Sequence, residues 1–153
     1  MGTHYQGTTA ERRALNTLIK LTRCADAVMA RLAGPLKRDG LTASQFGVLE
    51  ALLHLGPLHQ NELCAKLLKS GGNLTVVITN LEQRGLVRRR RDGSDRRYVR
   101  VELTNAGRRL IRRVFPRHLA VVTGELAALT AAEQLQLAGL CKKLGEREES
   151  AGR

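Results

Sequence analysis

The sequence is poor in aromatic residues and has no tryptophan: Phe, Tyr and Trp together make up 3% of its 153 residues. Its core must therefore be aliphatic, and a hydrophobic content of 42% is enough to form one and argues against a disordered chain. No apolar run reaches the roughly 18 residues of a membrane-spanning helix, and the polar N-terminus does not resemble a secretory signal. The cysteines, at positions 24, 64 and 141, are odd in number and widely spaced, which suggests no disulfide framework. We expect a soluble, cytoplasmic protein with reduced thiols.

Acidic residues are also scarce. Asp and Glu number 14 against 26 Lys and Arg, which gives a net charge of +12. Such an excess favours polyanionic partners, with nucleic acid first and an anionic membrane surface second. Catalytic signatures are missing as well: there is no phosphate-binding loop, no G-x-S-x-G sequence and no paired His/Glu motif, so we expect no enzyme and no cofactor. The histidines lack metal-site spacing, so we expect no metal; they are His4, His54, His59 and His118.

The chain has the length of one domain, at about 100–200 residues per domain, and we treat residues 1–153 as such. Apolar residues recur at the helical period from Thr9 to about Leu32, and Gly34-Pro35 is expected to end this helix. A capping box of Thr42 and Gln45 predicts a second helix, which Gly56-Pro57 ends. We expect the first eight residues and the polar tail after Leu144 to be loose.

Two short helices, over residues 60–68 and 71–84, are predicted on either side of a glycine-containing turn, and Gly85 closes the second. Two strand-like runs follow, 86–91 and 96–103, separated by Asp92-Gly93-Ser94-Asp95, which is typical of a hairpin. A helix over 104–126, kinked at Pro116, and another over 131–144, capped by Thr130 and Glu133, complete the chain. The fold class is mainly α (α+β), in the order α-α-α-α-β-β-α-α, with the outline of a helix-turn-helix and a basic wing.

The helix over 71–84 has two distinct faces. Leu74, Val77, Ile78 and Leu81 cluster on one side, whereas the opposite side is small and polar and carries no acidic residue. Asn side chains can hydrogen-bond adenine, Thr or Val methyls can contact the thymine methyl, and the helix N-terminus after Ser70 offers backbone N–H groups to a phosphate. The candidate DNA contacts here are Ser70, Gly72, Asn73, Thr75, Val76, Thr79 and Asn80. Taken alone, this face is more typical of an ordinary solvated surface than of a DNA-binding one.

The hairpin strengthens the nucleic-acid interpretation. Residues 84–100 contain eight arginines and two aspartates, a local charge of +6. Arginine binds phosphate through two hydrogen bonds and is attracted to a narrow minor groove. The candidates on the wing are Arg91, Asp95, Arg96 and Arg97. A second row of arginines, from Arg108 to Arg117, is compatible either with phosphate contacts or with a solvated face.

Several segments resemble the multiple-antibiotic-resistance regulator (MarR) family; they are LTASQFGVL (41–49), SGGNLT (70–75), NLEQRGLVR (80–88), DRR (95–97) and VELTNAG (101–107). The resemblance spans about Thr9 to Gly145. It implies a homodimeric winged helix-turn-helix regulator of transcription whose helix over 71–84 enters the major groove and whose wing, 88–100, reaches the minor groove. In the family's Asp-x-Arg wing motif the Asp orients the Arg, and Asp95 and Arg97 match it. Residues 42–104 then form the DNA-binding part, and residues 9–33 and 105–145 the dimerisation helices.

The resemblance also implies a repressor that binds a pseudo-palindromic operator and responds to a small aromatic or lipophilic effector. The expected site is a lipophilic pocket between the first, second and fifth helices. Cys24 offers an alternative, a redox sensor, because Lys20 and Arg23 lie nearby and cations favour a thiolate. Cys64 and Cys141 lie on apolar faces and are expected to be buried. A basic RNA-binding protein is a further alternative, although such proteins commonly stack bases on aromatics, and the hairpin has only Tyr98.

Overall fold

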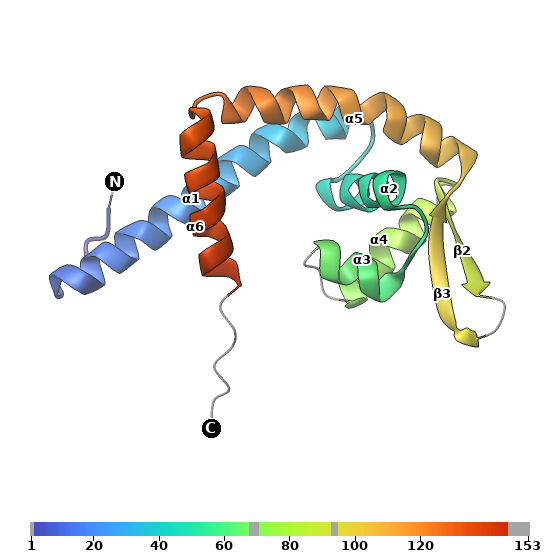
Figure 1. Ribbon diagram of the computed structural model, residues 1–153, viewed down its shortest axis with the longest axis horizontal. Helices are drawn as coiled ribbons and strands as arrows, with labels where there is room; N and C mark the ends of the chain where they lie inside the picture. The colour runs from blue at the N-terminus through green and yellow to red at the C-terminus, as the bar shows by residue number, and fades with distance from the viewer. Residues whose placement is uncertain (1, 68–70, 93–94, 147–153) are drawn as a thin grey trace. The chain divides into compact units, whose positions relative to one another are not determined.

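A computed structural model describes residues 2–67, 71–92 and 95–146, except for the side chains of residues 71, 92 and 95–98. It shows a mainly helical chain with a small antiparallel sheet, as predicted (Figure 1). The elements are α1 (Thr9–Arg38), α2 (Ala43–Leu55), β1 (Leu58–His59), α3 (Gln60–Leu67), α4 (Gly71–Gln83), β2 (Val87–Asp92), β3 (Asp95–Leu103), α5 (Asn105–Leu126) and α6 (Ala131–Gly145). The chain divides into two compact units, Met1–His118 and Leu119–Arg153. No helix in the described ranges is long and apolar enough to cross a membrane.

The predicted capping boxes are confirmed at the starts of α2 and α6. In each, a threonine hydroxyl accepts a hydrogen bond from a backbone N–H three residues later, and that residue's side chain accepts one from the threonine N–H. A third capping box, formed by Thr8 and Glu11, begins α1 and was not predicted. Each box satisfies backbone groups that would otherwise lack partners at the helix end, which explains why the helices begin where they do.

The expected end of the first helix at Gly34-Pro35 is wrong, because α1 continues through Pro35 to Arg38. The added turn places Leu36 in the core, where its exposure is 2%. Burying a leucine contributes about 1.5–3 kcal/mol, which helps to offset the hydrogen bond that proline cannot donate. Asp39 caps the end of the helix, and Gly40 follows with a φ of +70°, which suits glycine. Helix α5 likewise runs through Pro116; the kink there stays a prediction.

The sheet has the order β1-β3-β2 and is antiparallel throughout. Strand β1 was not predicted, because two residues are too short to show an alternating pattern. It pairs Leu58 with Val101 and so joins the turn before α3 to the base of the hairpin. The core of the first unit is aliphatic apart from Phe46, and α2, α4, β3 and α5 all contribute residues to it that are 4% exposed or less; these include Leu49, Leu52, Ile78, Leu81, Val101 and Ile111.

Close backbone contacts join the end of α4, the wing and the start of α5. Gly85, with a φ of +67°, ends α4, and the Thr104 hydroxyl donates a hydrogen bond of 2.6 Å to its carbonyl oxygen. The Thr104 N–H donates to the Leu86 carbonyl oxygen at 3.1 Å. A Cβ atom built on Gly107 would lie 1.9 Å from that same oxygen. Position 107 therefore has no room for any side chain, and the MarR-like segment at 101–107 has a direct structural role.

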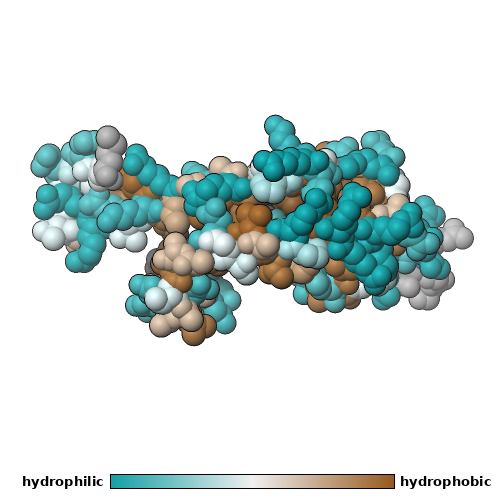
Figure 2. Space-filling view, turned by 90° about the horizontal axis from the view of Figure 1, so that it is seen from above, coloured by the Kyte–Doolittle hydropathy of each residue, from teal (hydrophilic) through white to brown (hydrophobic). Residues whose placement is uncertain are grey.

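Apolar residues also reach the surface. Figure 2 shows a largely hydrophilic face interrupted by separate apolar patches. Helix α6, in the second unit, buries none of its residues, and its exposed leucines are Leu135, Leu137, Leu140 and Leu144. In the first unit, Leu15, Leu18, Leu21 and Met29 of α1 are exposed in the same way. The expected burial of Cys141 is wrong in this single chain, since it lies on the unburied α6, whereas Cys64 is half-buried and packs against the core.

Candidate nucleic-acid interface

Helices α3 and α4 form the predicted helix-turn-helix. Leu63 of α3 and Leu74 and Ile78 of α4 are at most 1% exposed, so both helices are anchored in the core by their apolar faces. Residues 68–70, between the two helices, lie outside the described residues, and with them the candidate Ser70. Anchoring by one face fixes which side of α4 points outward, which is the first requirement of a recognition helix.

The outward face of α4 consists of the residues predicted from its helical period. Val76 is the most prominent apolar side chain on this face, with 60% of its surface exposed. Thr79 is half-buried; the other described candidates, Gly72, Asn73, Thr75 and Asn80, are exposed. Glu82, the acidic residue of α4, lies one turn after Thr79 at the edge of this face, where it is paired with Arg89. The rest of the face is made of groups that can approach base edges closely. It therefore has the shape and charge that a major-groove surface requires.

Gln60 of α3 was missed at the sequence level. Its side-chain amide donates a hydrogen bond of 2.6 Å to the hydroxyl oxygen of Thr75, fifteen residues away on α4. The bond fixes the orientation of one candidate contact relative to the preceding helix. The position of Gln60 in the sequence gives no sign of this role, because the pairing with Thr75 depends on how α3 and α4 pack. Only the hydrogen-bonding capacity of a glutamine side chain could have suggested it.

A network around Arg89 holds the wing to α4. Its guanidinium donates to the Glu82 carboxylate at 2.5 Å and to the Thr79 hydroxyl at 3.0 Å, and its backbone N–H donates to the same carboxylate at 3.0 Å. Arg89 pairs with Val101 across the hairpin, and its side chain is only 26% exposed. The arginine therefore positions the wing, and it also orients Thr79 on the candidate surface.

The other arginines of the hairpin are divided between internal and outward roles. Arg88 and Arg90 lie within 2.5 and 3.7 Å of the Glu102 carboxylate, and Arg84 donates to the Gly40 carbonyl oxygen at 2.9 Å. The net charge of +6 counted over residues 84–100 therefore overstates the positive charge available to a ligand. Glu82 and Glu102 lie outside these residues in the sequence, but they pair with arginines inside them. Arg91 is exposed and makes no ion pair with any described residue.

The remaining wing candidates lie at the tip of the hairpin. The backbones of Asp95, Arg96 and Arg97 belong to β3, and Asp95 pairs with Asp92 of β2 beside an irregularity in the register. Their side chains lie outside the described part of the structure, so the expected orientation of Arg97 by Asp95 stays a prediction. On α5, Arg117 pairs with Asp39 at 2.6 Å, whereas Arg108, Arg109, Arg112 and Arg113 are exposed.

The other predicted sites have separate locations. Cys24 is exposed on α1. A hollow of about 170 Å³ lies between α1, α2 and α3 rather than against α5, and it is lined by Met29, Ala43, Ser44, Gly47 and Leu67. Among the described residues, no group of three or more His, Cys, Asp and Glu side chains could hold a metal ion.

Comparison with known proteins agrees with this architecture. A sequence profile described as the MarR family matches residues 39–97, which span the helix-turn-helix and most of the wing. The HTH-type transcriptional regulator YkoM of Bacillus subtilis is 32% identical over 133 residues, 87% of this chain and 86% of its own. Among solved structures, AbsC, a MarR family transcriptional regulator from Streptomyces coelicolor, superposes with a TM-score of 0.80 at 27% identity, covering 93% of this chain and 96% of its own.

A second solved structure bears on ligands. BpsR of Bordetella bronchiseptica has a TM-score of 0.74 and is 28% identical, over 82% of this chain and 96% of its own. Its structure is described as a mechanism for the regulation of DNA binding by 6-hydroxynicotinic acid.

Proposed function

Because the chain belongs to the MarR family of winged helix-turn-helix transcriptional regulators, we propose that it is a ligand-responsive repressor that binds a pseudo-palindromic DNA site as a homodimer. The observation that carries the proposal is the small, polar outward face of α4, whose bordering carboxylate, Glu82, is paired with Arg89 of the adjoining arginine-bearing wing. In this arrangement α4 enters the major groove, and the wing tip reaches the neighbouring minor groove. Residues 42–104 form the DNA-binding part, and the protein acts in the cytoplasm.

Exposed apolar surface supports the homodimer. Leu18 on α1 and Leu140 on α6 are 55% and 59% exposed, and each lies among other exposed leucines of its helix. Exposed leucines grouped on one helix are typical of a surface that another protein chain covers. A two-fold interface built from residues 9–33 and 105–145 would bury the apolar faces of both helices, and it would place two copies of α4 about 34–36 Å apart, one turn of B-DNA.

An aromatic acid is the class of effector we propose, by analogy with the compound described for BpsR. The hollow between α1, α2 and α3 has two of the three helices expected to form such a site. At about 170 Å³ it is smaller than the roughly 300–1,000 Å³ of typical ligand cavities, so a ligand must displace Met29 or Leu67 to enter. Met29 is 52% exposed and has a flexible side chain, which makes it the easier of the two to move.

The wing is tested by a pair of substitutions with opposite electrostatic expectations. We expect Arg97→Ala to weaken DNA binding and to lower the salt slope by about one unit if a phosphate contact is lost. Asp95→Ala should also weaken binding because it removes the group that orients Arg97, although charge alone predicts tighter binding. Titration of labelled duplex at several salt concentrations measures both, and Arg23→Ala on α1 serves as a control for the loss of one exposed arginine outside the proposed DNA-binding surface. Tighter binding by Asp95→Ala would show that the orienting role is wrong.

The substitution Cys24→Ser distinguishes regulation by an aromatic acid from regulation by oxidation of Cys24. We expect this variant to release DNA with a non-oxidising aromatic acid as wild type does, with a coupling of about 5–150-fold in DNA affinity. The same factor should appear in reverse, as weaker ligand binding when DNA is present. Release by mild peroxide that requires Cys24, with no response to any aromatic acid, would instead identify a redox sensor.

A further inference from the structure

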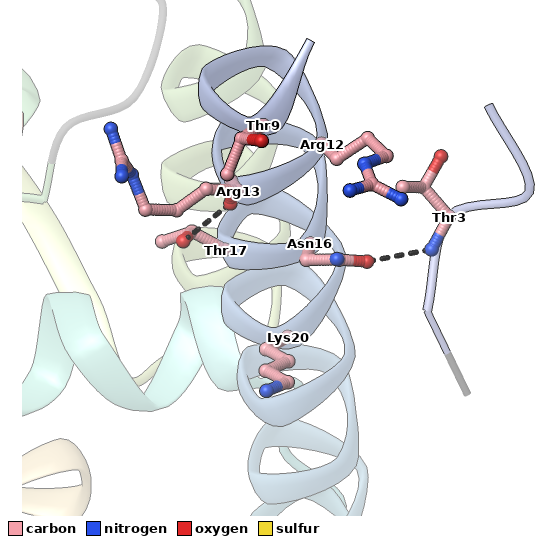
Figure 3. A pocket seen from close by; sticks show the side chains of 7 residues that line it. All are labelled: Thr3, Thr9, Arg12, Arg13, Asn16, Thr17 and Lys20. Carbon is pink, nitrogen blue, oxygen red and sulfur yellow. Dashed lines mark hydrogen bonds between the residues drawn. The ribbon is translucent and has the colours of Figure 1, made fainter. Parts of the chain in front are cut away.

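A polar hollow of about 430 Å³ lies on α1, far along the chain from the helix-turn-helix (Figure 3). It extends over the first three turns of the helix, and the N-terminal segment forms its side. Its lining contains three cations and no carboxylate; the lining residues that bear on its chemistry are Thr3, Arg12, Arg13, Asn16, Thr17 and Lys20. None of these residues belongs to the proposed DNA-binding surface.

The N-terminal segment turns a plain helix face into a hollow. The Thr3 N–H donates a hydrogen bond of 2.6 Å to the Asn16 side-chain oxygen, and Figure 3 shows Thr3 lying opposite this side chain. A Cβ atom on Gly2 would lie 2.7 Å from the same oxygen, so a side chain at position 2 would require the Asn16 side chain to move. Residues 2–7 form no helix or strand, and the expectation that they are loose stays a prediction beside this one bond to α1. Because the Asn16 oxygen is used, its amide N–H groups remain as donors for a ligand.

Within the part of the chain that the structure describes, no ion pair neutralises the positive charge of the hollow. Arg12, Arg13 and Lys20 make no ion pair with any described residue. Glu11 is the only acidic residue among the first 25, and it is used at the helix start, where it accepts hydrogen bonds from the Thr8 backbone N–H at 2.8 Å and hydroxyl at 2.9 Å. These bonds hold the pKa of Glu11 below its usual value. At 100° per residue, Glu11 also lies on the opposite side of α1 from the hollow.

The hollow stays open in the proposed dimer. On the helical wheel of α1, its residues centre about 180° away from Leu15 and Leu18, the exposed apolar side chains. Burial of the apolar face against a second chain therefore leaves the basic face in solvent. An ordinary amphipathic helix requires a polar face in solvent and nothing more. The absence of acidic residues from this face, and the N-terminal segment hydrogen-bonded along one side of it, are additional features that solvation alone does not explain.

We propose that this hollow binds a small, multiply charged anion, either a phosphate ester or a polycarboxylate. Arg12 and Lys20 are eight residues apart, about 12 Å along the helix, and their long side chains can reach anionic groups at the two ends of one ligand. Arginine provides paired donors for phosphate or carboxylate, and lysine a compact charge. Between them, the Asn16 amide can donate to a polar middle of the ligand, whereas the Thr17 hydroxyl donates to the Arg13 carbonyl oxygen at 2.9 Å and can only accept a hydrogen bond (Figure 3). The volume lies within the range of small-molecule sites, about 300–1,000 Å³.

Calorimetric titration of the full chain, without DNA, tests the proposal with two probes: inorganic tripolyphosphate for the phosphate class and citrate for the carboxylate class. The test variant is the double substitution Arg12→Gln/Lys20→Gln, and Arg109→Gln/Arg113→Gln on α5 removes the same charge elsewhere. We expect one site per chain for at least one probe, and an affinity about tenfold or more lower in the test variant alone, because charge-assisted hydrogen bonds are lost. The probe that binds identifies the class.

Two results would overturn the proposal. If neither probe binds at one site per chain, there is no anion site. If both double variants lose affinity equally, the anion responds only to the net charge of +12. Amide chemical shifts provide a second readout, and we expect the probe to shift Asn16 and Thr17 but not Arg109. None of these measurements involves DNA, so their outcome does not depend on whether the proposed DNA-binding function is correct.

Discussion

Replacing Val76 by glutamate should abolish specific DNA binding while leaving the fold intact. Val76 lies at the centre of the outward face of α4 and is 60% exposed, so the substitution adds a negative charge where the proposed complex places base edges and phosphates. It also removes methyl groups that can contact thymine. We expect an affinity about 100-fold lower or worse for genomic fragments selected by the wild-type protein, since wrong contacts to a base typically cost about 1–3 kcal/mol before charge repulsion is added.

The matched control is Val76→Thr, which keeps one methyl group and the size of the side chain. We expect it to bind within a few-fold of wild type. Both variants should unfold at the wild-type temperature, because exposed surface substitutions usually change stability by no more than about 0.5 kcal/mol. Undiminished binding by Val76→Glu would mean that α4 does not face the DNA.

A second large effect is expected from Gly107→Ala, this time on stability. The added Cβ would lie 1.9 Å from the Leu86 carbonyl oxygen and 2.9 Å from its carbon, both backbone atoms that cannot rotate away. Either α5 or the start of the wing must shift, and both are anchored in the core by Ile111 and Val87. We expect a loss of about 3 kcal/mol or more in the free energy of unfolding, which lowers the melting temperature by roughly 6–12 °C for a chain of this size.

Gly72→Ala is the control for that experiment, because nothing lies within 4 Å of a Cβ atom at position 72. In a helix, alanine is favoured over glycine by up to about 1 kcal/mol, so this variant should be as stable as wild type or slightly more stable. Thermal unfolding without DNA compares the two substitutions directly. Equal melting temperatures would show that the contact between Gly107 and Leu86 is not close.

The sequence was most informative where local rules and tertiary packing agree. The period of α4 separated Leu74 and Ile78 from Val76 correctly, because a helix anchored by one face must expose the other. Capping boxes located the starts of α2 and α6, since they depend on residues only three positions apart. Pro35 was misjudged because its cost is local, whereas the benefit of burying Leu36 depends on the rest of the fold.

The parts of the candidate site that escaped prediction are those held by distant partners. Glu82 and Glu102 neutralise hairpin arginines, and Gln60 orients Thr75, through contacts that exist only after the elements pack. The hollow on α1 is a similar case, because a polar segment with two glycines gives no periodic signal. The N-terminal segment is attached to Asn16 by one hydrogen bond, from the Thr3 N–H.

The measurement that tests the central claim most directly is an equilibrium titration of the chain with two duplexes made from its selected genomic site. One carries the whole site, and the other has one half scrambled. We predict two chains on the whole site, half-sites centred about 10–10.5 base pairs or a multiple apart, and binding to the half-site duplex that is weaker by about 100-fold or more. Single-stranded RNA of the same sequence should not compete. One chain per duplex with full affinity for the half-site, or equal competition by the RNA, would contradict a homodimeric DNA-binding regulator.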